Sequence, residues 1–147
     1  MKAGLALAAL IVSTAAAQAD PVIDDQKAAK QLRGKHALTL QWIGTGGLKD
    51  AGSAEVKPEA GEWHLVGRNE AKEGFVSLDG IVTKVGKTSF VFKGKIVTKV
   101  QYIFEGKECA REAEVTFERK GARKYWRMYP VENPCEAVSD YIDIYLR

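Results

Sequence analysis

Residues 90–104 read FVFKGKIVTKVQYIF, and this stretch decides the fold class. Apolar or aromatic side chains occupy nearly every second position, and lysine or glutamine occupies most of the positions between them. A period of two is typical of a strand with one buried and one solvent-facing side. We therefore predict a strand over residues 90–104, bent at Gly94 because glycine has no side chain to obstruct the bend. A hairpin that turns at Lys93-Gly94 is the alternative.

Shorter segments on both sides of this stretch show the same alternation. They are residues 36–43, 62–65, 76–85, 112–118, 125–129 and 142–146. The connections between them are hairpin-sized, whereas parallel neighbours need a crossover of about a dozen residues. Closing an antiparallel sheet on itself removes its exposed edges. We therefore predict an all-β protein, an antiparallel up-and-down barrel of about eight strands that forms a single domain over residues 20–147.

The first residues have the features of a secretory signal peptide. Lys2 precedes an apolar run from Ala3 to Ala17, and Ala17-Gln18-Ala19 matches a small-x-small cleavage pattern. The run is too short to cross a bilayer as a helix, and no later segment is apolar enough to do so. We expect a signal peptide over residues 1–19 and a periplasmic or secreted product with no membrane span.

A short helix is expected over residues 22–33, before the first strand. Asp24 and Asp25 suit its start, Lys30 and Arg33 suit its last turn, and Gly34 follows. Residues 44–61 are rich in Gly, Ser, Asp and Pro, with at most one short strand near residues 54–57. We interpret them as a long loop, either a flexible hairpin tip or a lid over a cavity mouth.

Cys109 and Cys135 are the two cysteines of the chain, and we expect them to form a disulfide because exported proteins meet an oxidising environment. A metal or redox pair is the alternative, but no CxxC spacing or neighbouring histidine supports it. The full chain has a net charge of +3, which falls by one when Lys2 is removed. So small an excess of positive charge argues against a nucleic-acid binder.

Known catalytic patterns are absent from the sequence. His36 and His64 are the only histidines and show no metal-ligand spacing, and no serine lies in a GxSxG or SxxK motif. The paired carboxylates, such as Glu112 and Glu114, fit a solvated strand face better than an acid–base site. We expect a non-enzymatic protein without metal or cofactor.

Basic and aromatic residues are densest between residues 119 and 129. Aromatic rings offer stacking faces and guanidinium groups bind anions through two hydrogen bonds, so this cluster suits an anionic or sugar ligand. Alternatively, Arg123 and Lys124 form cross-strand ion pairs with Glu112, Glu114 and Glu118. The alternation places Tyr125, Arg127 and Tyr129 on one face of a strand, with Trp126 and Met128 on the other.

The layout of a short helix followed by about eight strands and a disulfide resembles the calycin group, which includes lipocalins and avidins. Gly34-Lys35-His36 stands where lipocalins have Gly-x-Trp, so histidine replaces the tryptophan. The strings RKYWR (123–127), NPC (133–135) and DYIDIY (140–145) are similar to those of short exported bacterial proteins of uncharacterised function. The resemblance implies a barrel and carries over no catalytic residue.

A barrel of eight strands is wide enough to hold one small ligand or its own side chains. Our leading hypothesis is therefore a binding protein that holds a small, partly apolar ligand in its interior. The alternative is an envelope interaction protein that binds an anionic glycan, a lipid head group or a protein through surface basic and aromatic residues. The candidate ligand-binding residues are Trp42, Trp63, Arg123, Tyr125, Trp126 and Arg127.

Overall fold

The structure is a computed structural model that describes residues 4, 9–12 and 20–147. The predicted signal peptide over residues 1–19 lies for the most part outside the described residues and stays a prediction. No helix in the described part of the chain is both long enough and apolar enough to pass through a membrane.

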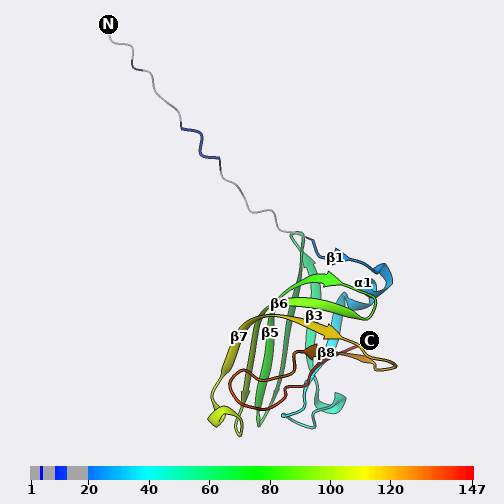
Figure 1. Cartoon of the computed structure of the whole chain (residues 1–147), viewed down its shortest axis with the longest axis vertical. Coiled ribbons are helices and arrows are strands. Elements are labelled where there is room, and N and C mark those ends of the chain that lie inside the picture. Colours follow the sequence, from blue (N-terminus) through cyan, green and yellow to red (C-terminus); the bar gives the residue numbers. More distant parts are fainter. Residues whose placement is uncertain (1–3, 5–8, 13–19) are drawn as a thin grey trace.

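The described chain contains one α-helix and nine strands (Figure 1). The strands are β1 (Val22–Ile23), β2 (Gly34–Leu40), β3 (Gly52–Glu59), β4 (Glu62–Ala71), β5 (Gly74–Val85), β6 (Ser89–Val100), β7 (Cys109–Glu118), β8 (Tyr125–Tyr129) and β9 (Ile142–Tyr145). The helices are α1 (Gln26–Leu32) and two 3-10 turns, η1 (Leu48–Asp50) and η2 (Phe104–Gly106).

Strands β2 to β9 form a closed antiparallel barrel in which each strand pairs with its neighbours in sequence. The ring closes where β9 pairs with β2, with Thr39 opposite Asp143. The predicted up-and-down barrel is therefore confirmed. One pairing departs from it: β1 lies parallel to β5, with Val22 opposite Lys84. β1 pairs only with the last two residues of β5, beyond Val82, where the pairing of β5 with β4 ends.

The alternative hairpin at Lys93-Gly94 is wrong, because β6 runs unbroken through both residues. The bend at Gly94 stays a prediction. Gly94 lies opposite Gly80 of β5. The strand ends at Val100, so the prediction that it reaches Phe104 is wrong. Residues 101–106 turn instead, with Phe104 and Glu105 at positive φ and Gln101 N–H donating to the Glu73 carbonyl over 2.9 Å.

Other boundaries also differ from the sequence predictions; the first strand, for example, ends at Leu40 rather than at residue 43. Residues 44–61 are not one long loop, because η1 and all of β3 lie inside them and β3 pairs along its length with β4. Ala54 and Val56 supply the buried face of β3, which the surrounding Gly, Ser and Pro residues conceal in the sequence. The helix begins at Gln26 rather than at residue 22, and Asp25 is its N-cap, accepting from Ala28 N–H over 2.8 Å.

Large side chains from all around the ring fill the barrel. Phe90 and Phe117 stack in parallel with centroids 4.9 Å apart, and Trp126 packs edge-on against Phe90. Leu32 of α1 covers one end and is fully buried. Burying aromatic and aliphatic side chains together is the main favourable term in the stability of this fold.

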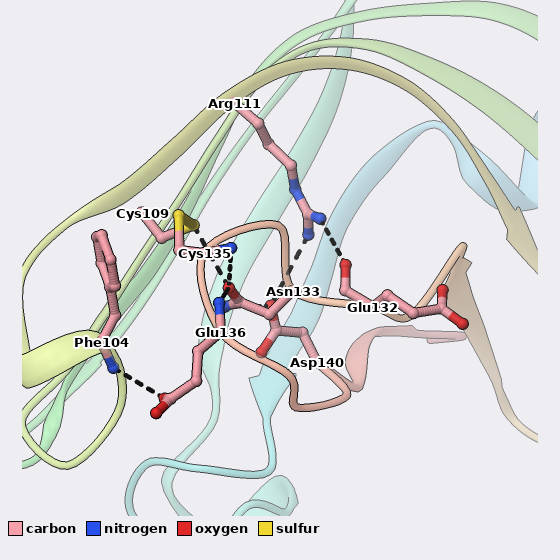
Figure 2. The surroundings of a disulfide bond; sticks show 8 residues. All are labelled: Phe104, Cys109, Arg111, Glu132, Asn133, Cys135, Glu136 and Asp140. Carbon is pink, nitrogen blue, oxygen red and sulfur yellow. Dashed lines mark hydrogen bonds and ion pairs between the residues drawn. A yellow bond between two sulfur atoms is a disulfide. The ribbon is translucent and has the colours of Figure 1, made fainter.

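The segment 130–141 lies at the end of the barrel opposite α1, which we call the loop end. The predicted disulfide between Cys109 and Cys135 is confirmed and holds this segment (Figure 2). The Asn133 side-chain oxygen accepts from the backbone N–H groups of Cys135 and Glu136, and its amide donates to Asp140 over 3.0 Å. Arg111 donates to the Glu132 carbonyl over 3.0 Å. The disulfide and the polar contacts of Arg111 therefore tie this segment to β7, whereas the Asn133 side chain orders the segment internally.

Candidate functional site

The larger hollows found on the described residues open on the outside of the barrel. A groove of about 570 Å³ runs over the outer face of β2 to β5, with small residues such as Ser53 and Ser77 on its floor and Glu55 and Arg68 among its walls. A second hollow of about 400 Å³ is lined by Gln31, Lys124, Leu146 and Arg147. Binding surfaces on this molecule are therefore best sought on its exterior.

Two of the predicted ligand-binding residues belong to the packed core. Trp63 is 7 % exposed and Trp126 is 4 % exposed. Trp126 lies edge-on to His36, whose two ring nitrogens face the carbonyl oxygens of Leu32 and Tyr145. These tryptophans thus pack the barrel and join it to α1.

Trp42 lies two residues after β2, beside the segment 130–141. Its indole N–H donates to the Asp140 carboxylate over 3.2 Å, and its ring packs edge-on against Tyr102. Burial raises the pKa of Asp140, while the hydrogen bonds from Trp42 and Asn133 and the charge of Arg111, 3.9 Å away, act in the opposite direction. Trp42 therefore takes part in anchoring the segment 130–141.

Four of the five tyrosines of the chain gather on the outer face of β8 and β9. All four are half-exposed or exposed. Tyr125 lies opposite Tyr145, and Arg127 lies opposite Asp143 in the same pair of strands. We call the rings of Tyr125, Tyr129, Tyr141 and Tyr145 the tyrosine surface. The strand register alone brings two of these rings to 5.2 Å between centroids, at Tyr125 and Tyr145.

Arg127 fixes the middle of the tyrosine surface. Its guanidinium donates two hydrogen bonds to the Asp143 carboxylate, over 2.8 and 2.9 Å. It also lies 4.0 Å from the ring centre of Tyr141 and 5.2 Å from that of Tyr125. The hydrogen bonds to Asp143 raise the pKa of Arg127 further, so its charge is constant. A planar guanidinium held in this way restricts the motion of both rings.

The turn 120–124, which we call the basic turn, adjoins the tyrosine surface. Arg123 lies over Tyr125, and Lys120 lies 4.4 Å from the ring centre of Tyr129. Lys124 is exposed and lines the hollow of about 400 Å³. The structure therefore brings together Arg123, Tyr125 and Arg127 of the predicted set, but not the three tryptophans.

The predicted pairing of Arg123 and Lys124 with Glu112, Glu114 and Glu118 is wrong. The register places Glu112 and Glu114 opposite Lys95 and Lys93 of β6. Within residues 20–147, neither Arg123 nor Lys124 forms an ion pair. The internal partner in this region is Asp143, which lies 16 residues further along the chain, in β9, and binds Arg127 instead.

Sequence reasoning missed the contribution of β9. Tyr141, Asp143 and Tyr145 alternate with buried Ile142 and Ile144, so the period-two pattern does place them on the outer face. The pattern alone does not show that β9 pairs with β8. It also does not show which connections share an end of the barrel: residues 86–88 and 119–124 lie near α1, and residues 41–51, 72–73, 101–108 and 130–141 lie at the other end.

Comparison with known proteins places the chain in a family. The model of the PM1083 family matches residues 20–146. The chain belongs to the PM1083 family. A relative in this family is the uncharacterized protein PM1083 of Pasteurella multocida (strain Pm70), which is 36 % identical over 119 residues, or 81 % of this chain and 76 % of the relative.

No solved structure matches the chain. The PM1083 family and the Pasteurella multocida relative carry no calycin or lipocalin name, so that part of the resemblance stays a prediction. The closed barrel and the tyrosine surface are the features from which a function for this PM1083 family member has to be argued.

Proposed function

We propose that this PM1083 family member is a non-enzymatic, extracytoplasmic binding protein that recognises an anionic glycan of the cell envelope through the tyrosine surface and the basic turn. The observation that carries the proposal is the gathering of four tyrosines around the Arg127–Asp143 pair, beside the unpaired cations Arg123 and Lys124 of the described chain.

The tyrosine surface has the chemistry of a glycan platform. A tyrosine ring buries a large area at small entropic cost, since it has few rotatable bonds, and its hydroxyl makes a hydrogen bond at the rim. The two hydrogen bonds between Arg127 and Asp143 hold the central rings in place in the absence of a ligand. Preorganisation of this kind lowers the free-energy cost of binding.

The basic turn supplies the attraction to negative charge. Arg123 and Lys124 are exposed, so they act on carboxylate or sulfate groups of a chain that lies on the neighbouring rings. Tyr141 is 39 % exposed, which leaves a face of its ring accessible to a ligand.

A small, partly apolar ligand inside the barrel is the second candidate. Its support is the closed barrel itself, since eight-stranded barrels hold small ligands in other proteins. Against it, fully buried Phe90, Phe92 and Phe117 occupy the centre of this barrel. The outer surface therefore has the stronger support.

Retention on immobilised alginate, a polymer of uronic acids, tests the proposal. We expect the purified chain to bind alginate beads, to pass through neutral agarose beads, and to elute with salt. The Arg123→Gln/Lys124→Gln variant should elute at lower salt, and Tyr125→Ser/Tyr141→Ser should be retained more weakly although its net charge is unchanged.

Matched controls come from the loop end of the barrel. Tyr102 is the fifth tyrosine and is 59 % exposed, and Lys49 lies in η1. Tyr102→Ser and Lys49→Gln should be retained like the unchanged protein. If the Tyr125→Ser/Tyr141→Ser variant is retained as strongly as the unchanged protein, simple ion exchange explains the retention on alginate. That result would refute the proposal.

A further inference from the structure

A separate hollow of about 130 Å³ lies between α1 and two turns at the same end of the barrel. Its lining consists of Asp25, Lys27, Ala28, Gln31, Lys87 and Arg119, and we call it the basic hollow. Lys87 belongs to the turn between β5 and β6, and Arg119 directly follows β7. Three parts of the chain that are distant in sequence thus bring cations to one place.

The positive charge of the basic hollow is not compensated within the described chain. Lys27, Lys87 and Arg119 form no ion pair with any described carboxylate. Asp25 is the one acidic residue of the lining, and it already accepts a hydrogen bond from Ala28 N–H over 2.8 Å. Three cations close to a single carboxylate attract an anion from solution.

Arg119 adds a second, independent observation. Its Nε is buried and has no hydrogen-bond partner, and it is the single such side-chain atom among residues that the structure describes. The backbone N–H of Arg119 donates to the Thr88 carbonyl over 2.8 Å, which anchors the residue beside the turn that carries Lys87. Buried donors in native proteins are nearly always satisfied, so an unpaired one next to a hollow indicates a missing acceptor.

We propose that the basic hollow binds a tetrahedral oxyanion, a phosphate or sulfate group. A guanidinium group donates to two oxygens of such an anion, and the two lysine ammonium groups and the Gln31 amide have further donors to offer. The volume corresponds to on the order of four water molecules, which is the size of one tetrahedral group rather than of a whole nucleotide or sugar chain. The site shares no residue with the tyrosine surface or the basic turn and goes beyond the function proposed above.

The side-chain NMR signal of Arg119 is the direct readout. Inorganic phosphate is titrated into ¹⁵N-labelled protein at constant ionic strength, with chloride as the compensating salt. We expect the Nε–Hε resonance of Arg119 to move saturably with phosphate and with sulfate but not with chloride. A resonance that stays unmoved, or that moves equally with chloride, overturns the proposal.

Variants test whether the lining residues hold the anion. Arg119→Gln and, separately, Lys87→Gln should weaken phosphate binding roughly tenfold or more, because each removes a charged hydrogen-bond donor. Lys49→Gln makes the same change of charge at the opposite end of the barrel and should leave binding unchanged. Lys87 is exposed, so its variant keeps the test decisive if Arg119→Gln fails to fold. Unaltered affinity in both lining variants contradicts the site.

The phosphate group has two sources that a further comparison separates. Phosphatidylcholine vesicles that contain phosphatidic acid offer a phosphomonoester on a surface, whereas inorganic phosphate is free. Binding to both indicates that a lipid head group reaches the hollow, and binding to free phosphate alone indicates a small soluble ligand; both support the site. Because Arg119 and Lys87 lie outside both the tyrosine surface and the basic turn, their variants should still bind alginate, so failure of this site and failure of the proposed function are distinguishable.

Discussion

Gly80 of β5 and Gly94 of β6 lie directly opposite each other in neighbouring strands, so close together that neither position has room for a side chain. A Cβ atom added to Gly94 would lie 2.5 Å from the Gly80 Cα and 2.4 Å from the Asp79 carbonyl oxygen. Both strands are twelve residues long, and the absence of side chains here lets their backbones approach closely at the position where the sequence predicts a bend.

Gly94→Ala should therefore destabilise the protein by about 1–3 kcal/mol, because the methyl group has to displace the backbone of β5. Gly47→Ala is the matched control, since the nearest atom to an added Cβ there is the Thr45 hydroxyl at 3.9 Å. Urea unfolding of both variants measures the difference. A Gly94→Ala protein as stable as the control would show that the close approach of β5 and β6 is not required.

Removal of the disulfide should lower the free energy of unfolding by roughly 2–5 kcal/mol, since Cys109 and Cys135 join β7 to the segment 130–141. The Cys109→Ser/Cys135→Ser variant should melt at a lower temperature than the unchanged protein, as followed by circular dichroism. A reductant should lower the melting temperature of the unchanged protein and leave that of the variant alone. Titration of two free thiols in the native protein would contradict the bond.

The buried carboxyl of Asp140 should give the stability a pH dependence of its own. Burial raises its pKa in the folded protein, so the folded state binds the proton more tightly than the unfolded chain does. The contribution of Asp140 to stability is then fully present below its ordinary pKa of 3.8 and is lost as the pH rises through the higher folded value. The advantage of the unchanged protein over Asp140→Asn should consequently shrink as the pH rises from about 3.5 toward neutrality. Urea unfolding across this range checks the sign, and an advantage that grows with pH would contradict it.

An uncharged apolar probe should not quench the tryptophan fluorescence saturably if side chains fill the barrel. Trp63 and Trp126 are the reporters, because both are buried in the core. Met128→Ala removes a fully buried side chain on the same face of β8 as Trp126 and leaves an apolar cavity. It should lower the free energy of unfolding by about 2–5 kcal/mol. That variant, with xenon as the quenching probe, is the positive control, because the cavity left by one side chain admits only a small apolar species. Saturable quenching in the unchanged protein would restore the interior ligand as the leading hypothesis.

The sequence predicted the parts of the fold that depend on local patterns. Alternation along residues 76–85 and 125–129 gave correct strands, and Asp25 was correctly placed at the start of the helix. Local patterns failed where turn-forming residues lie inside a paired strand, as in β3, and where the alternation continues past a strand, as at Tyr102. Pairing with β4 supplies the missing stabilisation of β3, and such long-range hydrogen bonds have no signature in a short window of sequence.

The sequence predicted only part of the candidate site. Arg123, Tyr125 and Arg127 occupy alternate positions of one segment and did come together, whereas Trp63 and Trp126 are buried in the core and Trp42 binds Asp140. The strand pattern already separated Trp126 from Tyr125, but it did not say which face was the interior.

By itself, the sequence determined that the chain forms a curved antiparallel sheet, because the period of its apolar residues depends only on neighbours in the chain. It also contained the two cysteines and the glycines that this sheet needs. Tertiary structure alone decided that Asp143 neutralises Arg127, that Tyr141 and Tyr145 complete the tyrosine surface, and that Lys27, Lys87 and Arg119 surround one hollow. Closure of the barrel brings residues 25–31 beside residues 87 and 119, and the energies of such contacts depend on distances in space that a linear pattern does not encode.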